Sequence, residues 1–327
     1  MEELLDALIQ LALDKRASDI HFTCSHGQLH IQLRTMQGLI DIDQNVWKPA
    51  FFEFLKFHAR FDLTNPWIPQ SGQFVYHDIF CRFSVIYNHD IQTGVLRLLH
   101  TQMDLKIEDL TLDVSQRQFL HQLTTIRQGL VLCVGPTNSG KTTTLHAILH
   151  EIALNKRYKV VSLEDPIEID DPSYLQLEIN PSQGFTYECG IEELLRHDPD
   201  VILIGETRNS YTAKMVIRAA LTGHMVFTTL HAKNGKESIS RMMDFGIAKY
   251  ELKTTLTAIL AQRLYMSSAS SKQCIYELLT GKELRYVLEN DAYSPTHITL
   301  DQAIRKALIQ GDITDKQAEL DIQDLKG

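Results

Sequence analysis

The fold is decided by the stretch Leu130-Val131-Leu132-Cys133-Val134-Gly135-Pro136-Thr137-Asn138-Ser139-Gly140-Lys141-Thr142. Its first five residues form a short apolar run of the length of a buried strand. From Thr143 to Asn155, apolar residues recur at helical spacing, so a helix is expected to follow the loop directly. Glycines allow a loop between a strand and a helix to turn its backbone N–H groups inward, and the helix N-terminus adds positive potential. The stretch therefore predicts a loop that holds phosphate groups.

The spacing of the two glycines, the lysine and the threonine is that of the P-loop of nucleotide-hydrolysing enzymes. In this interpretation Lys141 reaches the β- and γ-phosphates of ATP, and the hydroxyl of Thr142 holds Mg²⁺. An ordinary glycine-rich turn is the alternative, but the strand before the loop and the helix after it favour phosphate binding. The predicted nucleotide-binding residues are Gly135, Pro136, Thr137, Asn138, Ser139, Gly140, Lys141, Thr142 and Thr143.

Three further apolar runs, Val160–Leu163, Val201–Ile204 and Met225–Leu230, have the length of strands and alternate with helical segments. Fully apolar strands separated by amphipathic helices indicate a parallel sheet that is covered on both faces, so the fold class is α/β. Beyond about residue 247 the pattern is mostly helical. We expect residues 116–327 to form one nucleotide-binding domain, with residues 247–327 as a helical extension.

A polar residue follows each of these strands, where ligands of open α/β sheets bind. Glu164 could orient and deprotonate an attacking water, and Glu206 could support Mg²⁺ as a Walker B acid. His231 follows the third strand. Taken singly, these residues also fit an acidic turn, a solvated strand end and a structural histidine. Together with the phosphate loop, their order along the chain favours an ATP-hydrolysing site.

The first hundred residues have a different pattern. Residues 1–13 carry leucines on one side of a helix, and an aromatic helix is expected from Ala50 to about Phe61. Alternating segments such as Cys81–Tyr87 and Val95–Leu99 indicate strands. We therefore expect a small α+β domain over residues 1–100, joined to the larger domain by a polar linker and hinge over residues 101–115.

Composition narrows the possible functions. The 327 residues carry a net charge of −9 and no basic run, which disfavours direct binding to nucleic acid. The sequence offers no secretory signal, no membrane-spanning run and no disulfide framework, so a cytoplasmic protein that reaches a membrane through a partner is expected. His21, Cys24, His26 and His30 lie close together, but their spacing does not match a zinc site, and no zinc is expected.

These motifs together resemble the ATPases of type II secretion and type IV pilus assembly, the GspE- and PilB-like family. The resemblance covers roughly residues 15–290. It rests on the phosphate loop, an acidic box at 162–168, a Walker B segment at 194–206, a histidine box at 222–234, Leu260-Ala261-Gln262-Arg263-Leu264, and the N-terminal segments Ala17-Ser18-Asp19-Ile20-His21-Phe22 and Val95-Leu96-Arg97-Leu98-Leu99.

The resemblance implies a RecA-like ATPase domain preceded by an α+β, PAS-like domain. It also implies Glu164 as the catalytic base, Glu206 acting on Mg²⁺ and its waters, and His231 at the γ-phosphate with His224 nearby. The family's N-terminal arginines, which complete the nucleotide site, fall on Arg82 and Arg97. Members work as homohexameric rings on an inner-membrane platform protein, and hydrolysis moves their domains about a hinge.

The sequence departs from the family at some positions. Asn138 replaces a usual glycine of the loop, and Thr207 and Asn209 replace the usual residues after the Walker B glutamate. The four-cysteine zinc insert that follows the Gln262-Arg263 signature in many members is missing from the sequence. This short form fits two branches: the competence pilus assembly ATPase of Gram-positive bacteria (ComGA-like), used for DNA uptake, and the type IV pilus retraction motor.

The segment Cys274-Ile275-Tyr276-Glu277-Leu278-Leu279 is similar to assembly-type members, and we favour the competence branch. Two other classes remain open. A non-hydrolysing ATP-binding scaffold would have no need of both Glu164 and Glu206. A nucleic-acid helicase or packaging motor would share the RecA-like core, but the net charge disfavours it.

Overall fold

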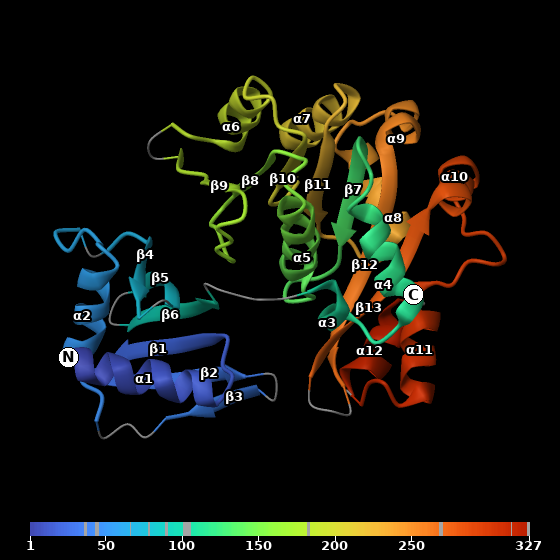
Figure 1. Ribbon diagram of the computed structural model, residues 1–327. Helices are drawn as coiled ribbons and strands as arrows, with labels where there is room; N and C mark the ends of the chain where they lie inside the picture. The colour runs from blue at the N-terminus through green and yellow to red at the C-terminus, as the bar shows by residue number, and fades with distance from the viewer. Residues whose placement is uncertain are drawn as a thin grey trace. The chain divides into compact units, whose positions relative to one another are not determined.

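A computed structural model describes the whole chain except residues 36–37, 43–45, 66, 78, 89–90, 101–105, 182–183, 268–270, 315 and 326–327. The chain divides into two compact units, Met1–Met103 and Asp104–Gly327. Figure 1 shows the first unit in blue to teal and the second in green to red. Each unit has its own hydrophobic core, and each is described by itself.

The first unit is a six-stranded antiparallel sheet in the order β3-β2-β1-β6-β5-β4. One face of the sheet packs against two helices, because alternate strand residues such as Ile20 and Phe83 meet Leu8 and Phe52 in a single core. The expected α+β pattern is confirmed. The elements are α1 (Glu2–Asp14), β1 (Asp19–Ser25), β2 (Gln28–Thr35), β3 (Gly38–Asp41), α2 (Pro49–His58), β4 (Gln70–Tyr76), β5 (Ile79–Asn88) and β6 (Ile91–His100).

The second unit contains a seven-stranded sheet in the order β13-β12-β7-β11-β10-β8-β9. All its neighbouring strands are parallel except the edge pair β12–β13. The strands are β7 (Gly129–Val134), β8 (Val160–Glu164), β9 (Leu175–Glu178), β10 (Val201–Ile204), β11 (Met225–Leu230), β12 (Leu256–Met266) and β13 (Lys272–Thr280).

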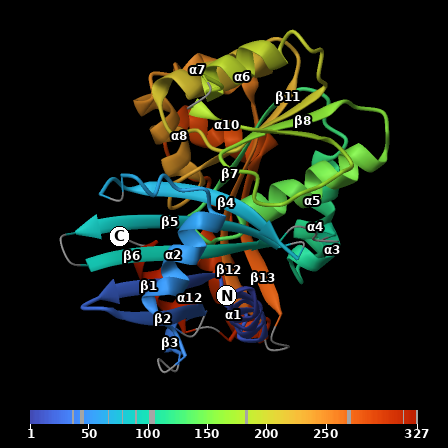
Figure 2. The same ribbon diagram turned by 90° about the vertical axis from the view of Figure 1, so that its left-hand side faces the viewer.

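Helices cover both faces of this sheet, and each face has its own buried cluster. Figure 2 shows α3, α4 and α5 gathered on one side, while α6–α12 supply the cluster of the other face. The helices are α3 (Ile107–Leu110), α4 (Val114–Leu123), α5 (Lys141–Leu154), α6 (Tyr187–Leu194), α7 (Ser210–Leu221), α8 (Gly235–Asp244), α9 (Lys249–Thr255), α10 (Gly281–Asn290), α11 (Leu300–Gln310) and α12 (Gln317–Asp324).

The four strands predicted from apolar runs are confirmed as β7, β8, β10 and β11, and their order places β7 beside β11 rather than beside β8. β12 lies on the other side of β7, so both neighbours of β7 in the sheet come from much later in the sequence. This crossed order is that of a RecA-like α/β core, and it confirms the expected fold class.

The expectation of a mostly helical segment from residue 247 is wrong for residues 256–280. These residues form β12 and β13, which extend the central sheet, and the helical part begins only at Gly281. Polar residues such as Gln262 and Glu277 obscure the strand pattern in the sequence, yet both are fully buried. Their side chains bind backbone groups of neighbouring elements, which satisfies them inside a strand.

The expected linker is also shorter than residues 101–115. Ile107 and Leu110 of α3 are buried in the cluster that includes α5, so residues 107–115 belong to the second unit. Residues 101–105 lie outside the described residues. None of the helices formed by the described residues combines the length and the apolar character that crossing a bilayer requires.

Candidate active site

The predicted phosphate loop joins β7 to α5. Its backbone needs positive φ angles at three positions: +156° at Gly135, +62° at Asn138 and +84° at Gly140. Asn138 thus adopts a left-handed conformation, which asparagine tolerates better than most residues. A Cβ atom on Gly135 would lie 2.6 Å from the carbonyl oxygen of Gln262 and from Oγ of Ser139, so only glycine fits there.

The first turn of α5 has no side-chain cap, because the residue at the cap position is Gly140. Backbone N–H groups at an uncapped helix N-terminus, together with a curled glycine loop, form a site for an anion. Among the described residues, buried Oγ of Ser139 also has no hydrogen-bond partner. The loop therefore offers donors that fit the phosphates of a nucleotide.

Lys141 lies against this loop. Its Nζ donates to the carbonyl oxygens of Gly135 and Pro136, at 3.0 and 2.8 Å, and the side chain is almost fully buried. Burial lowers the pKa of Lys141, and the nearby carboxylate of Glu206 acts in the opposite direction. The ammonium group is thus held at the loop, within the electrostatic influence of Glu206.

Gln262 supports the loop from β12, a role that the sequence did not reveal. Its Nε2 donates to the carbonyl oxygen of Ser139 at 2.6 Å, and Sγ of Cys133 donates to its Oε1 at 3.0 Å. Gln262 is completely buried. The Gln262-Arg263 signature therefore lies on the strand directly beneath the phosphate loop.

Glu164 ends β8, and its carboxylate is buried in a dense set of hydrogen bonds. Oε1 accepts from Ser162 Oγ at 2.6 Å and from Gln176 Nε2 at 3.1 Å. Oε2 lies 3.1 Å from Nε2 of His146 on α5. Burial raises the pKa of Glu164, but the hydrogen bonds and the positive potential of His146 outweigh it, so the pKa is lowered and the group is a carboxylate.

Glu206 follows β10 and faces the side chains of Arg208 and His231. Nε of Arg208 donates to its Oε2 at 2.7 Å, and Nε2 of His231 lies 3.4 Å from its Oε1. Nη1 of Arg208 also lies 3.7 Å from Oδ2 of Asp165, and the bond to Glu206 raises the pKa of the guanidinium. Arg208 is a further site residue that the sequence analysis missed, because a single exposed arginine in a loop carries no pattern.

His224 does not lie near His231 within the chain. His224 precedes β11 and His231 follows it, so the full length of the strand separates them. Nδ1 of His224 lies 3.1 Å from the carbonyl oxygen of Ala219 and 3.0 Å from Oγ1 of Thr222. The expectation of His224 close to the γ-phosphate is therefore wrong for one chain; this side chain ties the end of α7 to the start of β11.

The four functional strands lie side by side as β7-β11-β10-β8, and all four run parallel. Their carboxyl ends consequently meet at one edge of the sheet. Lys141, His231, Glu206 and Glu164 follow or end these strands, and Figure 1 shows the four strands between the surrounding helices. The structure thus brings together the predicted residues of the second unit.

Arg82 and Arg97 belong to the first unit, where they are directly opposite each other on β5 and β6. Both project from the face opposite the core, and Nε of Arg97 donates to Oδ1 of buried Asp19 at 2.7 Å. Asp19 is also opposite Arg34 on β2. Arg34, Asp19, Arg97 and Arg82 therefore form a row across β2, β1, β6 and β5, in which Asp19 lies between Arg34 and Arg97.

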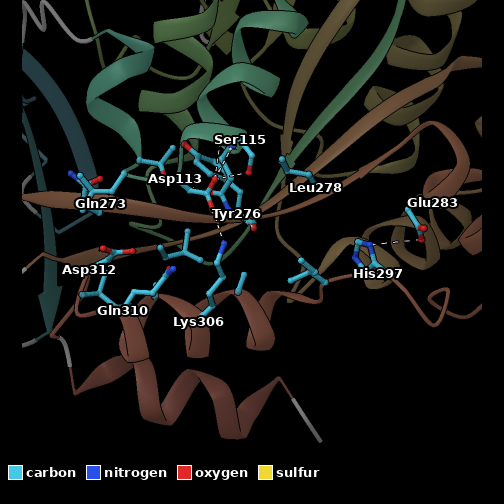
Figure 3. Close-up of a pocket in the computed structure, with 18 of the residues that line it drawn as sticks. Asp113, Ser115, Gln273, Tyr276, Leu278, Glu283, His297, Lys306, Gln310 and Asp312 are labelled. Carbon is cyan, nitrogen blue, oxygen red and sulfur yellow. Dashed lines mark hydrogen bonds and ion pairs between the residues drawn. The ribbon is translucent and has the colours of Figure 1, made fainter.

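A separate cavity of about 280 Å³ lies between the start of α4, β13 and α11, as Figure 3 shows. Lys306 reaches across it to Oδ2 of Asp113 at 3.2 Å. Gln273 and His297 also line the cavity, and among the described residues buried Oε1 of Gln273 has no hydrogen-bond partner. In the described part of the chain no group of three or more His, Cys, Asp or Glu side chains could hold a metal ion.

Comparison with known proteins assigns the family. The model of the family described as Type II/IV secretion system protein matches residues 1–308. The chain belongs to this family. The resemblance noted in the sequence is confirmed, and the chain is a member of the secretion and pilus ATPases.

Among its relatives is the "Competence protein ComGA" of Halalkalibacterium halodurans, 34% identical over 336 residues that cover 95% of this chain and 96% of the relative. The "Competence protein ComGA" of Bacillus subtilis is 31% identical, and the match covers 96% of both chains. A type II secretion system protein E from Dickeya dadantii is 34% identical, but this match covers only 54% of the longer relative.

The solved structures agree on the fold. The pilus retraction motor PilT with bound ADP superposes with a TM-score of 0.77 and 25% identity over 96% of this chain and 95% of PilT. The ATPase DotB of Legionella pneumophila gives a TM-score of 0.76 at 20% identity, over 98% of this chain and 95% of DotB. The likeness to DotB bears on the fold alone.

Proposed function

We propose that this chain hydrolyses ATP with the help of Mg²⁺ and that the site lies at the carboxyl edge of the larger sheet. The observation that carries the proposal is the meeting of Lys141, Glu206, His231 and Glu164 at that edge, beside an uncapped helix N-terminus. The bound ADP of PilT, to which the chain is 25% identical, supports a nucleotide as the ligand.

In this proposal the loop from Gly135 to Thr143 binds the phosphates, and Lys141 stabilises charge on the β- and γ-phosphates. Glu164 accepts a proton from the attacking water. Counting only donors from the described part of the chain, Oε1 of Glu164 is fully used and one lone pair of Oε2 remains for that water. His231 polarises the γ-phosphate from the neighbouring strand.

Mg²⁺ prefers oxygen ligands, and the Thr142 hydroxyl and the Glu206 carboxylate supply them. When bound, the ion neutralises charge on the phosphates. Arg208 and His231 each contact one oxygen of Glu206 and so restrain this carboxylate. The donor set at this edge therefore fits a magnesium–nucleotide complex.

Arg82 and Arg97 would complete the nucleotide site from the first unit, since arginine stabilises charge that develops on the γ-phosphoryl oxygens. Their placement opposite each other on one sheet face supports a joint role. Asp19 restrains Arg97 by accepting a hydrogen bond from its Nε. A homohexameric ring with a hinge between the two units would couple hydrolysis to domain motion.

We further propose that the chain drives assembly of a competence pseudopilus for DNA uptake, acting in the cytoplasm on an inner-membrane platform protein. Support comes from the two ComGA proteins, which match at 34% and 31% identity over nearly their whole length. The likeness to PilT favours a second candidate, a type IV pilus retraction motor.

Deletion of the gene separates the two candidates, with pseudopilus assembly and DNA uptake scored in the same cells. Loss of both surface filaments and transformation supports assembly. Excess surface filaments would instead show retraction. Complementation with the wild-type gene and with Lys141→Ala distinguishes a need for ATP from a need for the protein alone.

A further inference from the structure

We propose that His146 is a positioning residue for Glu164, whose Nε2–H fixes oxygen Oε2 of the carboxylate for its work on the attacking water. The inference rests on the proposed function and deepens it. His146 lies on α5, the helix that Lys141 begins, and it is 3% exposed. The same helix would therefore bind the phosphates at its N-terminus and orient the base from its side.

The hydrogen bonds around His146 define which nitrogen carries the proton. Nε2 lies 3.1 Å from Oε2 of Glu164, and Nδ1 lies 2.5 Å from the hydroxyl of Tyr174. Glu164 has a lowered pKa and is an acceptor, so Nε2 must donate. Burial raises the pKa of Tyr174, which therefore stays protonated and can donate to Nδ1. The hydrogen-bonded chain Tyr174–His146–Glu164 thus has a donor and an acceptor at each of its two contacts.

This bond differs in effect from the other two bonds to the carboxylate. Ser162 and Gln176 both donate to Oε1, whereas His146 is the donor to Oε2 among the described residues. Oε2 is the oxygen that retains a lone pair for water. Without His146 the carboxylate could rotate or take up a proton at that oxygen, and either change would misplace the lone pair that the reaction needs.

A purely structural interpretation is the alternative, since buried polar groups in cores are normally paired. The chain offers a matched control for it. His150 lies one turn further along α5, and its Nδ1 is 2.7 Å from Oδ2 of Asp171, in the segment that also carries Tyr174. His150 thus also pairs with a carboxylate, through Nδ1 and at a more exposed position, and this pair touches no predicted site residue in the described part of the chain.

The experiment compares His146→Gln, His146→Asn and His150→Gln in the full-length protein. The amide nitrogen of glutamine lies as many bonds from Cβ as Nε2 of histidine, so it can still donate to Glu164, whereas that of asparagine is one bond shorter. We measure kcat and KM for ATP, affinity for a non-hydrolysable ATP analogue, and Tm.

We expect His146→Asn to lower kcat by about ten- to a hundredfold, which is the loss for one charge-assisted bond, with analogue affinity within about twofold of wild type. His146→Gln should restore kcat to within about threefold, and His150→Gln should match wild type. If the Asn variant does not fold, Tyr174→Phe replaces it, with an expected fall in kcat of about threefold or more.

Equal kcat values for the Asn, Gln and wild-type proteins would overturn the inference and leave the proposed ATPase intact. The inference would also be overturned if kcat fell in proportion to the loss of Tm in the His146 and His150 variants alike. If the wild type hydrolyses no ATP, the proposed function fails and this inference falls with it.

Discussion

The side-chain amide of Gln262 donates to the carbonyl oxygen of Ser139 across 2.6 Å, which ties strand β12 to the middle of the phosphate loop. Oε1 of the same side chain accepts from Cys133 on β7 at 3.0 Å. One buried glutamine thereby fixes the loop relative to the two strands below it. A loop that must present backbone N–H groups in a fixed arrangement gains from such a support, because its own residues are glycines and short polar side chains.

Gln262→Ala should weaken ATP binding and lower stability. The substitution leaves the buried carbonyl of Ser139 and the thiol of Cys133 without this partner, at a cost of about 1–3 kcal/mol in unfolding free energy. A looser loop should also reduce nucleotide affinity by about tenfold, measured by titration with a fluorescent ATP analogue.

Gln273→Ala is the control for this change. Gln273 is a buried glutamine on the next strand, β13, whose Oε1 has no partner among the described residues. Its removal should leave nucleotide affinity unchanged. Equal loss of affinity in both variants would show that Gln262 acts through general stability of the sheet and not through the loop.

Lys141→Ala should abolish hydrolysis and weaken nucleotide binding by at least about tenfold, because the phosphates lose their one lysine partner at the loop. Lys233→Ala removes the same charge from an exposed lysine that pairs with Asp324 at 3.3 Å, and it should hydrolyse ATP as the wild type does. Wild-type hydrolysis by Lys141→Ala would rule out the phosphate loop as the site.

Glu277→Ala should destabilise the second unit by about 3 kcal/mol, measured by urea unfolding. The buried carboxylate accepts from the backbone N–H of Gly235 at 3.3 Å and of Leu300 at 3.1 Å, the first residues of α8 and α11. Each bond to a charged acceptor at a helix N-terminus contributes about 1.5 kcal/mol or more. Glu283→Ala, at a more exposed site, should cost less than about 1 kcal/mol.

Asp113→Ala should cost about 1 kcal/mol at neutral pH, because Asp113 caps α4 by accepting from the backbone N–H of Ser115 at 2.8 Å. Burial raises the pKa of Asp113, but its bonds from Ser115, Gln116 and Lys306 prevail and lower it. Because the pKa of Asp113 is lower in the folded chain than its ordinary value of 3.8, the carboxylate contributes stability that is fully present above pH 3.8. This contribution is lost as the pH falls through the pKa of the folded state.

The stability difference between wild type and Asp113→Ala should therefore be constant near neutral pH and shrink at acid pH. Asp113→Asn retains an uncharged cap, so its free energy of unfolding at neutral pH should lie between those of the wild type and Asp113→Ala. A difference that grew toward acid pH would contradict the assigned direction of the pKa shift.

Much of the sheet was predictable because its central strands are buried on both faces. A strand such as Val201–Ile204 has no polar residue, so its apolar run marks it without help from tertiary structure. The carboxyl ends of these strands then predicted Glu164, Glu206 and His231 as neighbours. The structure brings them to one edge, as parallel strands require.

β12 and β13 could not be recognised from the same rule. Gln262, Arg263 and Glu277 interrupt their apolar pattern, and their partners lie in the phosphate loop, after β11 and at two helix N-termini. The local sequence does not predict these partners, because they lie far away along the chain. His146 is a similar case, because the helix pattern shows that it faces inward but not that it meets Glu164.

The most direct test of the account is a single-turnover measurement with wild type and Glu164→Gln, each in excess over labelled ATP and Mg²⁺. The wild type should convert bound ATP into ADP and phosphate. Glu164→Gln should bind ATP with similar affinity and hold it unhydrolysed, because an amide cannot take the proton from water. Binding of ATP by the wild type without formation of ADP, or equal turnover by both proteins, would contradict the central claim that Glu164 is the base of an ATPase.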